Sequence, residues 1–430
     1  MRKATIWAIV LLAYTGISVG KLGKALLTPF HLYMGLLIGY GLLVSRKERN
    51  YVHVSLLVLM LWVLVVNILQ FPNIRYTSIL YTFIYALEIT ILYNLMRRVD
   101  MDTILYSLKF ILYSYCINLF LGFAFDTVGF RNPAILEIIR VHYAEGESHG
   151  RPMGFSTEPS YAAFILSASF LSYCHLRDHK WDRETMMLAG AYFMSIIFSK
   201  SAYGFIFVAV NLMDWALYIY GKGSKGLRGL FPLIAIVGSV GLGVVMANSE
   251  NEVAQRLTKV SKVMFDPTVD SQKRMKKLQE ADGSAFARIG PTYLLLTSDD
   301  SENLNLMMGA GAGAAGEFMA EFLAGIAVDE GTEKLDAGII PAFIFDYGLI
   351  GFVLLWIFLI NCFSGLPAPF WIMFFLIMPN ANVNTQLLWF GISCFLFTSI
   401  AKSTEKRRAQ AGSPSLDPPP APTPTYLSTP

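Results

Sequence analysis

The sequence predicts an all-α polytopic integral membrane protein with about 12 transmembrane helices and one large loop outside the membrane. Of its 430 residues, 54% are hydrophobic and only 15% are charged, well below the roughly 25% charged fraction of soluble domains. The apolar residues also occur in blocks of about 16 to 23, the length of a helix that crosses a hydrocarbon core. Both observations argue against a soluble globular protein.

One helix is assigned to each apolar block, and the eleventh is short enough to be re-entrant. The predicted spans are 4–20, 26–45, 51–71, 76–96, 103–125, 158–176, 185–199, 202–220, 230–247, 340–362, 369–379 and 387–401. The chain then divides into helices one to nine (1–247, with an outward loop at 126–157), a large loop (248–339), helices ten to twelve (340–401) and a Pro-rich tail (402–430). The tail is too rich in proline to fold, and we expect it to be disordered.

Lys and Arg residues in the short loops predict the orientation. With the N-terminus inside, seventeen of them fall in inside segments and seven in short outside segments. Both termini should therefore be cytoplasmic, and the loops at 126–157 and 248–339 should face outward. Within the second loop, NEVAQRLTKVSKVMF has helical spacing. The run MMGAGAGAAG (307–316) should form a turn or a closely approached backbone.

The sharpest local feature is GRPMGFSTEPSY (150–161), where an outward loop enters the sixth helix. Ser156 or Thr157 can cap this helix, and Pro159 suits its first turn. A helix N-terminus favours anions, and the guanidinium of Arg151 adds a fork for phosphate oxygens. Glu158 is suited to act as a general base at this surface, although the plainer interpretation is a carboxylate that stabilises the helix dipole.

Two further cations should lie on the same side. Lys200 is in FSKSAYG between two helices, and Arg288 is in GSAFARIGPTYLLL of the large loop. A lone interfacial cation is usually a membrane anchor, so each is weak evidence alone. Their joint placement with Arg151 around Glu158 supports a site hypothesis.

Acidic residues inside apolar blocks should face the interior of the bundle, because a charge in lipid costs at least about 2.5 kcal/mol. They are Glu88, Asp214 and Asp346. We interpret Glu88 and Asp214 as contacts between helices, since both should lie toward the cytoplasmic side.

Several classes of site lack support in the sequence. His142, Glu145, Glu147 and His149 do not have HExxH spacing, so we predict no metal site and no cofactor. Cys116, Cys174, Cys362 and Cys394 have no CxxC spacing and are interpreted as inert thiols. Walker, Rossmann and GxSxG motifs are absent, and no basic stripe suggests nucleic-acid binding.

The segments RPMGFSTEPSY, SKSAYG, SAFARIGPTYLLL with GAGAGAAGEF, and FDYGLIGFVLLW together resemble the O-antigen polymerase and O-antigen ligase superfamily. The resemblance covers about residues 1 to 400. It implies a GT-C-like membrane glycosyltransferase of the bacterial inner membrane, acting at its periplasmic face on undecaprenyl-diphosphate-linked oligosaccharides. It also implies partners, namely a chain-length regulator and polysaccharide export proteins.

By this resemblance, Arg151, Glu158 and Arg288 match catalytic positions. We also assign Lys200, Asp336 and Tyr161 to substrate binding. Ligases of the superfamily usually carry a histidine before the tenth helix, where this chain has KLDAGII. That departure favours a polymerase over a ligase and leaves Asp336 as a substitute polar group. Arginines that neutralise the leaving diphosphate would make a metal unnecessary.

Two other functions remain open at this point. A flippase or other secondary transporter would also have many spans and intramembrane charges, but such proteins often contain internal repeats, which this sequence lacks. A structural partner in a polysaccharide export complex, without chemistry of its own, is the other alternative.

Overall fold

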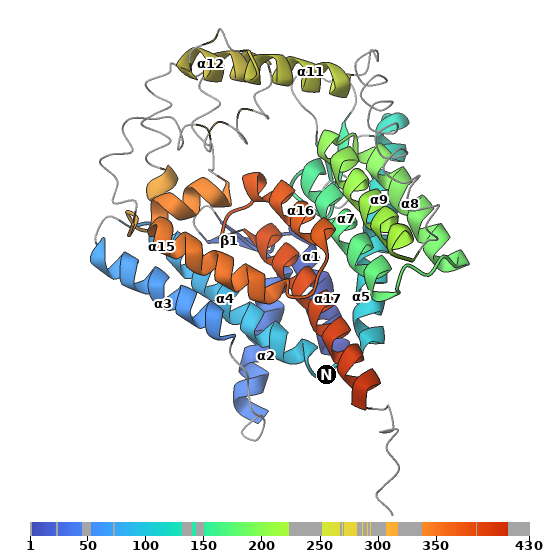
Figure 1. Ribbon diagram of the computed structural model, residues 1–430, viewed down its shortest axis with the longest axis horizontal. Helices are drawn as coiled ribbons and strands as arrows, with labels where there is room; N and C mark the ends of the chain where they lie inside the picture. The colour runs from blue at the N-terminus through green and yellow to red at the C-terminus, as the bar shows by residue number, and fades with distance from the viewer. Residues whose placement is uncertain are drawn as a thin grey trace, which may run out of the picture.

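The computed structural model describes most of the chain (Figure 1), and its elements are almost all helical. The described residues are 2–22, 25–44, 53–71, 74–130, 140–142, 150–222, 252–266, 269, 271–281, 286, 290, 293, 307–316, 338–383 and 385–411. The helices of the first half are α1 (Arg2–Ala13), α2 (Pro29–Val44), α3 (Val54–Leu69), α4 (Tyr76–Met96), α5 (Met101–Thr127), α7 (Pro159–Leu176), α8 (Arg183–Ser199) and α9 (Ala202–Lys222). The others are α11 (Glu252–Met264), α12 (Ser271–Ala281), α15 (Ile339–Cys362), α16 (Ala368–Ile377), the 3₁₀ turn η2 (Met378–Asn380) and α17 (Gln386–Ala411).

The described helices are those of a membrane-embedded protein. Five segments are long and apolar enough to cross a membrane: Tyr76–Met96, Met101–Thr127, Tyr203–Gly221, Ile339–Cys362 and Gln386–Lys406. Three shorter helices are also apolar, at Pro29–Gly39, Val54–Leu69 and Ala368–Ile377. The all-α membrane class is supported, while the total of twelve spans stays a prediction.

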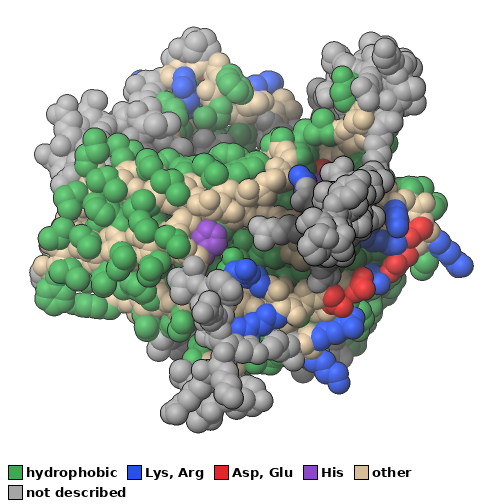
Figure 2. Space-filling model, turned by 60° about the horizontal axis from the view of Figure 1, so that its bottom comes forward, with side chains coloured by type: hydrophobic (Ala, Val, Ile, Leu, Met, Phe, Trp, Pro, Cys, Tyr) green, Lys and Arg blue, Asp and Glu red, His purple; other side chains and the backbone are tan. Residues whose placement is uncertain are grey.

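Helix α3 illustrates why lipid is the natural solvent. Its inner side, with Leu59 and Val63, is buried and packs on α15. Its outer side is equally apolar but exposed: the exposed fractions of the residues are 48% for Leu57, 52% for Leu61 and 64% for Ile68. A helix that is apolar on all sides, with one side uncovered, is suited to a bilayer. Hydrophobic side chains cover a broad area in the space-filling view (Figure 2).

Eleven of the twelve predicted spans overlap a described helix, and the span at 230–247 lies outside the described residues. The first helix is shorter than predicted, because α1 ends at Ala13 instead of residue 20. The side-chain amide of Gln386 donates to the carbonyls of Leu11 (3.0 Å) and Leu12 (2.8 Å), and the Tyr115 hydroxyl donates to that of Ala13 (2.6 Å). These side chains satisfy the last carbonyls of α1, so the helix can stop inside the protein.

After α1 the chain forms a short antiparallel hairpin of β1 (Gly20–Leu22) and β2 (Ala25–Leu27). At the other end of the chain, α17 continues to Ala411, so residues 402–411 are helical although the tail was expected to begin at 402. Residues 412–430 lie outside the described part.

Helix α7 is the centre of the bundle. All residues from Ala162 to Cys174 are buried, and α5, α8, α9, α16 and α17 pack around the helix. Small side chains on α7 allow close approach, and its serines bond to neighbouring helices. The Ser167 hydroxyl lies 2.8 Å from that of Tyr192, and the Asn211 amide donates to the Tyr192 hydroxyl at 3.1 Å.

Glu88 and Asp214 connect helices, as predicted. Both are 3% exposed. Glu88 on α4 pairs with His31 on α2, whose Nδ1 lies 2.9 and 3.0 Å from the two carboxylate oxygens. Asp214 on α9 pairs with His179 of the α7–α8 turn, with 2.6 Å between Oδ2 and Nε2. Each acid is therefore buried with a partner, which offsets the cost of taking it out of water.

One end of the bundle carries most of the described ionic contacts. Lys402 of α17 donates to Asp178 of the α7–α8 turn at 2.8 Å. Arg97, at the end of α4, lines the same surface hollow as Thr404 and Glu405 of α17. The ends of α4, α7 and α17 therefore meet here. Lys, Arg, Asp and Glu side chains gather on one side of the view that brings this end forward (Figure 2).

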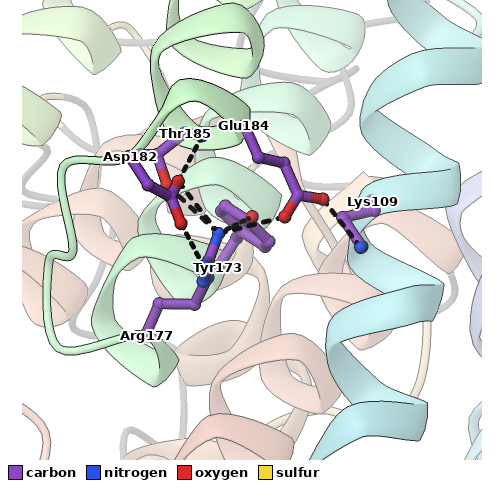
Figure 3. A network of polar contacts seen from close by, with 6 residues as sticks. All are labelled: Lys109, Tyr173, Arg177, Asp182, Glu184 and Thr185. Atoms are coloured by element: carbon purple, nitrogen blue, oxygen red, sulfur yellow. Dashed lines mark hydrogen bonds and ion pairs between the residues drawn. The ribbon is translucent and has the colours of Figure 1, made fainter.

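Arg177 organises a network in the α7–α8 turn (Figure 3). Its guanidinium donates to the Tyr173 hydroxyl at 2.7 Å and to the Asp182 carboxylate at 2.5 Å. Glu184 accepts from Arg177 at 3.2 Å and from Lys109 of α5 at 2.7 Å. The network fastens α5, α7 and α8 to one another at this end.

Helices α11 and α12 lie across the top of the bundle in Figure 1, apart from the other helices. The helical spacing of NEVAQRLTKVSKVMF is confirmed by α11. Arg274 of α12 donates to the carbonyls of Asp266 (2.6 Å) and Val269 (3.0 Å), which fixes the turn between the two helices.

Candidate functional site

The segment before α7 is held in place by α1 and α5. It includes β4 (Arg151–Gly154), which pairs antiparallel with β3 (Arg140–His142). The Phe155 ring lies against Tyr14 (4.6 Å between centroids) and Tyr115 (5.6 Å). The Phe155 carbonyl accepts from the amide of Gly16 at 2.8 Å. These contacts place the backbone around Arg151 at a defined position over the bundle.

Gly154 is required by this packing. Its φ is +62°, a region that other residues enter at a cost of about 1–2 kcal/mol. A Cβ atom here would also lie 2.8 Å from Cδ1 of Tyr115. The glycine therefore lets the chain turn over a buried aromatic ring and enter α7.

The start of α7 differs in part from the predicted cap. Pro159 begins the helix, as expected, but Glu158 is the N-cap residue and its side chain makes no capping hydrogen bond. The Ser156 hydroxyl lies 2.6 Å from the Met153 carbonyl and 2.7 Å from the Glu158 carbonyl, so it stabilises the turn and does not cap. The predicted cap by Ser156 or Thr157 is wrong.

The Glu158 carboxylate is exposed, and its Oε2 accepts from the Ser160 hydroxyl at 3.0 Å. Its place at the N-cap of α7 agrees with the plainer interpretation of a carboxylate that stabilises the helix dipole, although its side chain makes no capping hydrogen bond. A solvent-accessible carboxylate at a helix start, oriented by a hydroxyl, can accept a proton from an approaching group.

Lys200 joins α8 to the segment before Arg151. It ends α8 in the left-handed conformation, with φ 50°. Its Nζ donates to the Gly150 carbonyl at 3.2 Å and lies 3.9 Å from Oδ2 of Asp126. Asp126 also accepts from the Gly150 amide at 2.9 Å. The backbone that leads into Arg151 is thus held between the ends of α5 and α8.

The structure brings four of the six predicted residues to one end of the bundle. Arg151 and Tyr161 are half-buried there, and Glu158 and Lys200 are exposed. Arg288 and Asp336 lie outside the described residues, so their predicted convergence on this place stays a prediction. The four residues come from β4, the first turn of α7 and the end of α8.

Asp126 was missed by the sequence reasoning. It is only 4% exposed, at the last turn of α5, and it holds both the Gly150 amide and Lys200. The available signal was its place at the end of an apolar block, where a charged residue usually marks the membrane surface.

The glycine-rich run 307–316 packs closely against α3, α4 and α15, which confirms the predicted close backbone approach. The amide of Ala312 donates to the Asn67 side chain at 2.9 Å, and the Ala312 carbonyl accepts from the amide of Arg75 at 2.8 Å. Gly309 has φ +82°, and a Cβ atom there would lie 2.5 Å from the amide nitrogen of Gly348. Gly348 itself interrupts α15, with φ 69° and ψ −179°.

Asp346 fixes this run and is buried as predicted. Its two carboxylate oxygens accept from the amides of Gly313 (3.0 Å) and Ala315 (2.9 Å). The exposed side chain of Arg75 lies along the same run, with Nη1 3.5 Å from the position of a Cβ on Gly316. Arg75 therefore adds a cation at the junction of α3, α4 and α15.

Two surface hollows lie at the opposite, charged end of the bundle. One of about 240 Å³ is lined by Arg97 and Glu405, and one of about 400 Å³ by His53, Tyr93 and Arg97 among others. Neither contains any of the six predicted site residues. A comparison of the chain with protein-family models and with curated proteins finds no match.

Proposed function

We propose that this chain is a membrane glycosyltransferase that lengthens a bacterial cell-envelope polysaccharide. The donor would be an undecaprenyl-diphosphate-linked glycan and the acceptor a second lipid-linked glycan. The product would be an O-antigen, a capsule or an exopolysaccharide. The proposal rests on the motif resemblance and on the placement of Arg151, Glu158, Tyr161 and Lys200 at one end of the bundle.

The observation that carries the proposal is the surface at the start of α7. A half-buried arginine, Arg151, lies three residues along β4 from a tight glycine turn, and the exposed carboxylate of Glu158 follows at the helix N-terminus. A helix N-terminus with a nearby guanidinium suits a diphosphate. A carboxylate at the same place suits proton removal from a sugar hydroxyl.

In the proposed reaction, Arg151 and Arg288 hold the donor diphosphate. Glu158 takes the proton of an acceptor hydroxyl, whose oxygen forms a bond to the anomeric carbon of the donor glycan. The bond from that carbon to the diphosphate oxygen breaks, and the electron pair leaves with the lipid diphosphate. Arginine neutralises the charge that develops on the leaving group, which lowers the barrier.

We also propose that this surface faces the periplasm of the inner membrane. The opposite end holds Arg97, Arg177 and Lys402, joined by the contacts of α4, the α7–α8 turn and α17. An excess of Lys and Arg at one end is typical of the cytoplasmic side. Tags at each terminus, tested for access in intact cells and in inverted vesicles, would check the orientation.

The test is chain growth by the purified protein in liposomes supplied with undecaprenyl-diphosphate-linked repeat units. We expect longer glycans from the wild type and a rate about 10²- to 10³-fold lower in Arg151→Ala, as for removal of a charge-stabilising donor. Glu158→Gln should be slower by about 10²-fold or more, since it keeps the shape and removes the base. Arg183→Ala removes an exposed cation at the other end and should leave the rate unchanged.

The same assay separates the alternatives. A flippase would move the repeat units across the sealed bilayer without lengthening them. A ligase would transfer the glycan only when a different lipid acceptor is added. Wild-type rates in both Arg151→Ala and Glu158→Gln would remove the start of α7 from the mechanism.

A further inference from the structure

A cluster of three metal-ligating side chains lies at the C-terminal end of α7, opposite the candidate glycan site. It consists of His175 in the last turn of α7, His179 in the α7–α8 turn and Asp214 on α9. One ligand atom of each residue lies within 4.8 Å of those of the other two. His179 and Asp214 are 7% and 3% exposed, while His175 is half-buried and gives access from the surface.

The backbone after α7 places His179 in this cluster. The amide of His179 donates to the Cys174 carbonyl at 2.9 Å, and that of Asp178 donates to the His175 carbonyl at 3.2 Å. This pair of bonds is the Schellman arrangement, which normally uses glycine in the left-handed conformation. Here Asp178 (φ 49°) and His179 (φ 52°) are both left-handed, at a cost of about 1–2 kcal/mol each.

Such strain persists where the surrounding structure fixes it, and strained residues cluster at functional sites. The turn reverses the chain so that His179 is brought back over the end of α7, four residues after His175. The His179 ring is stacked on Tyr218, with 4.2 Å between centroids, and meets the edge of Trp215 at 5.0 Å. These rings fix its orientation, and Nε2 points at Asp214.

We propose that His175, His179 and Asp214 bind a divalent transition-metal cation, with Zn²⁺ as the probe. Two imidazoles and one carboxylate are a ligand set that zinc uses, leaving further positions for water. Ligands at about 2.0–2.1 Å from zinc are separated by about 3.3 Å. The 2.6 Å contact of His179 with Asp214 would open by less than an ångström, and a rotation of His175 would close the remaining gap.

The ring nitrogens of His175 support this inference. The ring packs against Phe370, with 5.2 Å between centroids. Within the described part of the chain it makes no hydrogen bond, in contrast to His179. One ligand atom of His175 lies within 4.8 Å of those of His179 and Asp214, so the ring is suited to act as a third metal ligand.

The His31–Glu88 pair provides a matched control. It has the same buried histidine–carboxylate contact, at 2.9 Å, but among the described residues it is not part of a three-ligand group. If the His179–Asp214 contact were a helix connection of the same kind, the two pairs would respond alike to a metal.

The experiment measures Zn²⁺ bound per chain in the full-length protein, purified in detergent, treated with chelator and then titrated with Zn²⁺. We expect one Zn²⁺ per wild-type chain, and binding weaker by at least about 10- to 100-fold in His175→Ala, the loss that removal of even an outer-shell partner causes. His31→Gln should bind as the wild type does. Co²⁺ should give a visible ligand-field spectrum in the wild type, and this spectrum should be lost in His175→Ala and in Asp214→Asn.

His175→Ala is the informative variant because the His175 ring makes no hydrogen bond to another described residue, so the chain should still fold. Zn²⁺ should raise the unfolding temperature of the wild type and of His31→Gln, and leave that of His175→Ala unchanged. Equal Zn²⁺ affinity in the wild type and His175→Ala would overturn the proposal. So would a loss of Zn²⁺ affinity in His31→Gln as large as that in His175→Ala. The result is independent of glycan transfer, which takes place at the other end of α7.

Discussion

Removing the Asp346 carboxylate should release the glycine-rich run from α15. Its oxygens accept from the amides of Gly313 and Ala315, and Ala315 is only 3% exposed. In Asp346→Ala both N–H groups lose their acceptor. An unpaired buried donor costs about 1–3 kcal/mol, and the half-buried Gly313 recovers part of this from water. We therefore expect about 2–4 kcal/mol of local destabilisation, and less in Asp346→Asn, which keeps one acceptor oxygen.

Hydrogen exchange of the peptide that covers residues 307–316 measures this effect directly. A loss of about 2–4 kcal/mol corresponds to exchange about 30- to several hundred-fold faster. Asp102→Asn removes an exposed carboxylate from the first turn of α5 and should leave this peptide unchanged. Unchanged exchange in Asp346→Ala would refute the role of the carboxylate as the anchor of the run.

Two further predictions concern backbone strain and pH. Gly309→Ala should destabilise the protein by well over 1 kcal/mol, because φ +82° is combined with a Cβ 2.5 Å from the Gly348 amide. Gly365→Ala, with φ +79° and open space, should cost only about 1 kcal/mol, and equal unfolding midpoints would contradict this. The Thr185 amide, by its hydrogen bond, lowers the pKa of Asp182 from 3.8 to about 2. The wild type should therefore lose stability relative to Asp182→Asn as the pH falls from about 4 to about 2, and parallel pH profiles would contradict this.

The helices were predictable because lipid requires long apolar runs with satisfied backbones. The span at 76–96 coincides with α4, and the short eleventh span corresponds to α16 followed by a 3₁₀ turn. The end of α1 was not predictable, because it depends on Gln386, more than 370 residues away in sequence. A hydropathy pattern contains no information about such tertiary caps.

The candidate site was predictable in its location and less so in its contacts. The motif at 150–161 placed Glu158 at the start of a helix and Arg151 a few residues before it; the structure has Glu158 at the N-cap of α7 and Arg151 on β4. The hydrogen bonds of Gly150 with Asp126 and Lys200 could not be derived, because they depend on how the ends of α5 and α8 meet. The His175–Asp214 group was missed for the same reason, since α9 supplies its third ligand.

The attachment of residues 307–316 to the bundle changes the chain between α9 and α15 from one long connection into two shorter ones. Residues 307–316 form a fixed end of both connections, so the entropic cost of closing one loop does not depend on the length of the other. An insertion between Gly316 and Gly338 should therefore leave the hydrogen bonds of residues 307–316 with Asn67 and Asp346 unaffected. The two connections can therefore vary in length separately, because both end at the same attached run, residues 307–316.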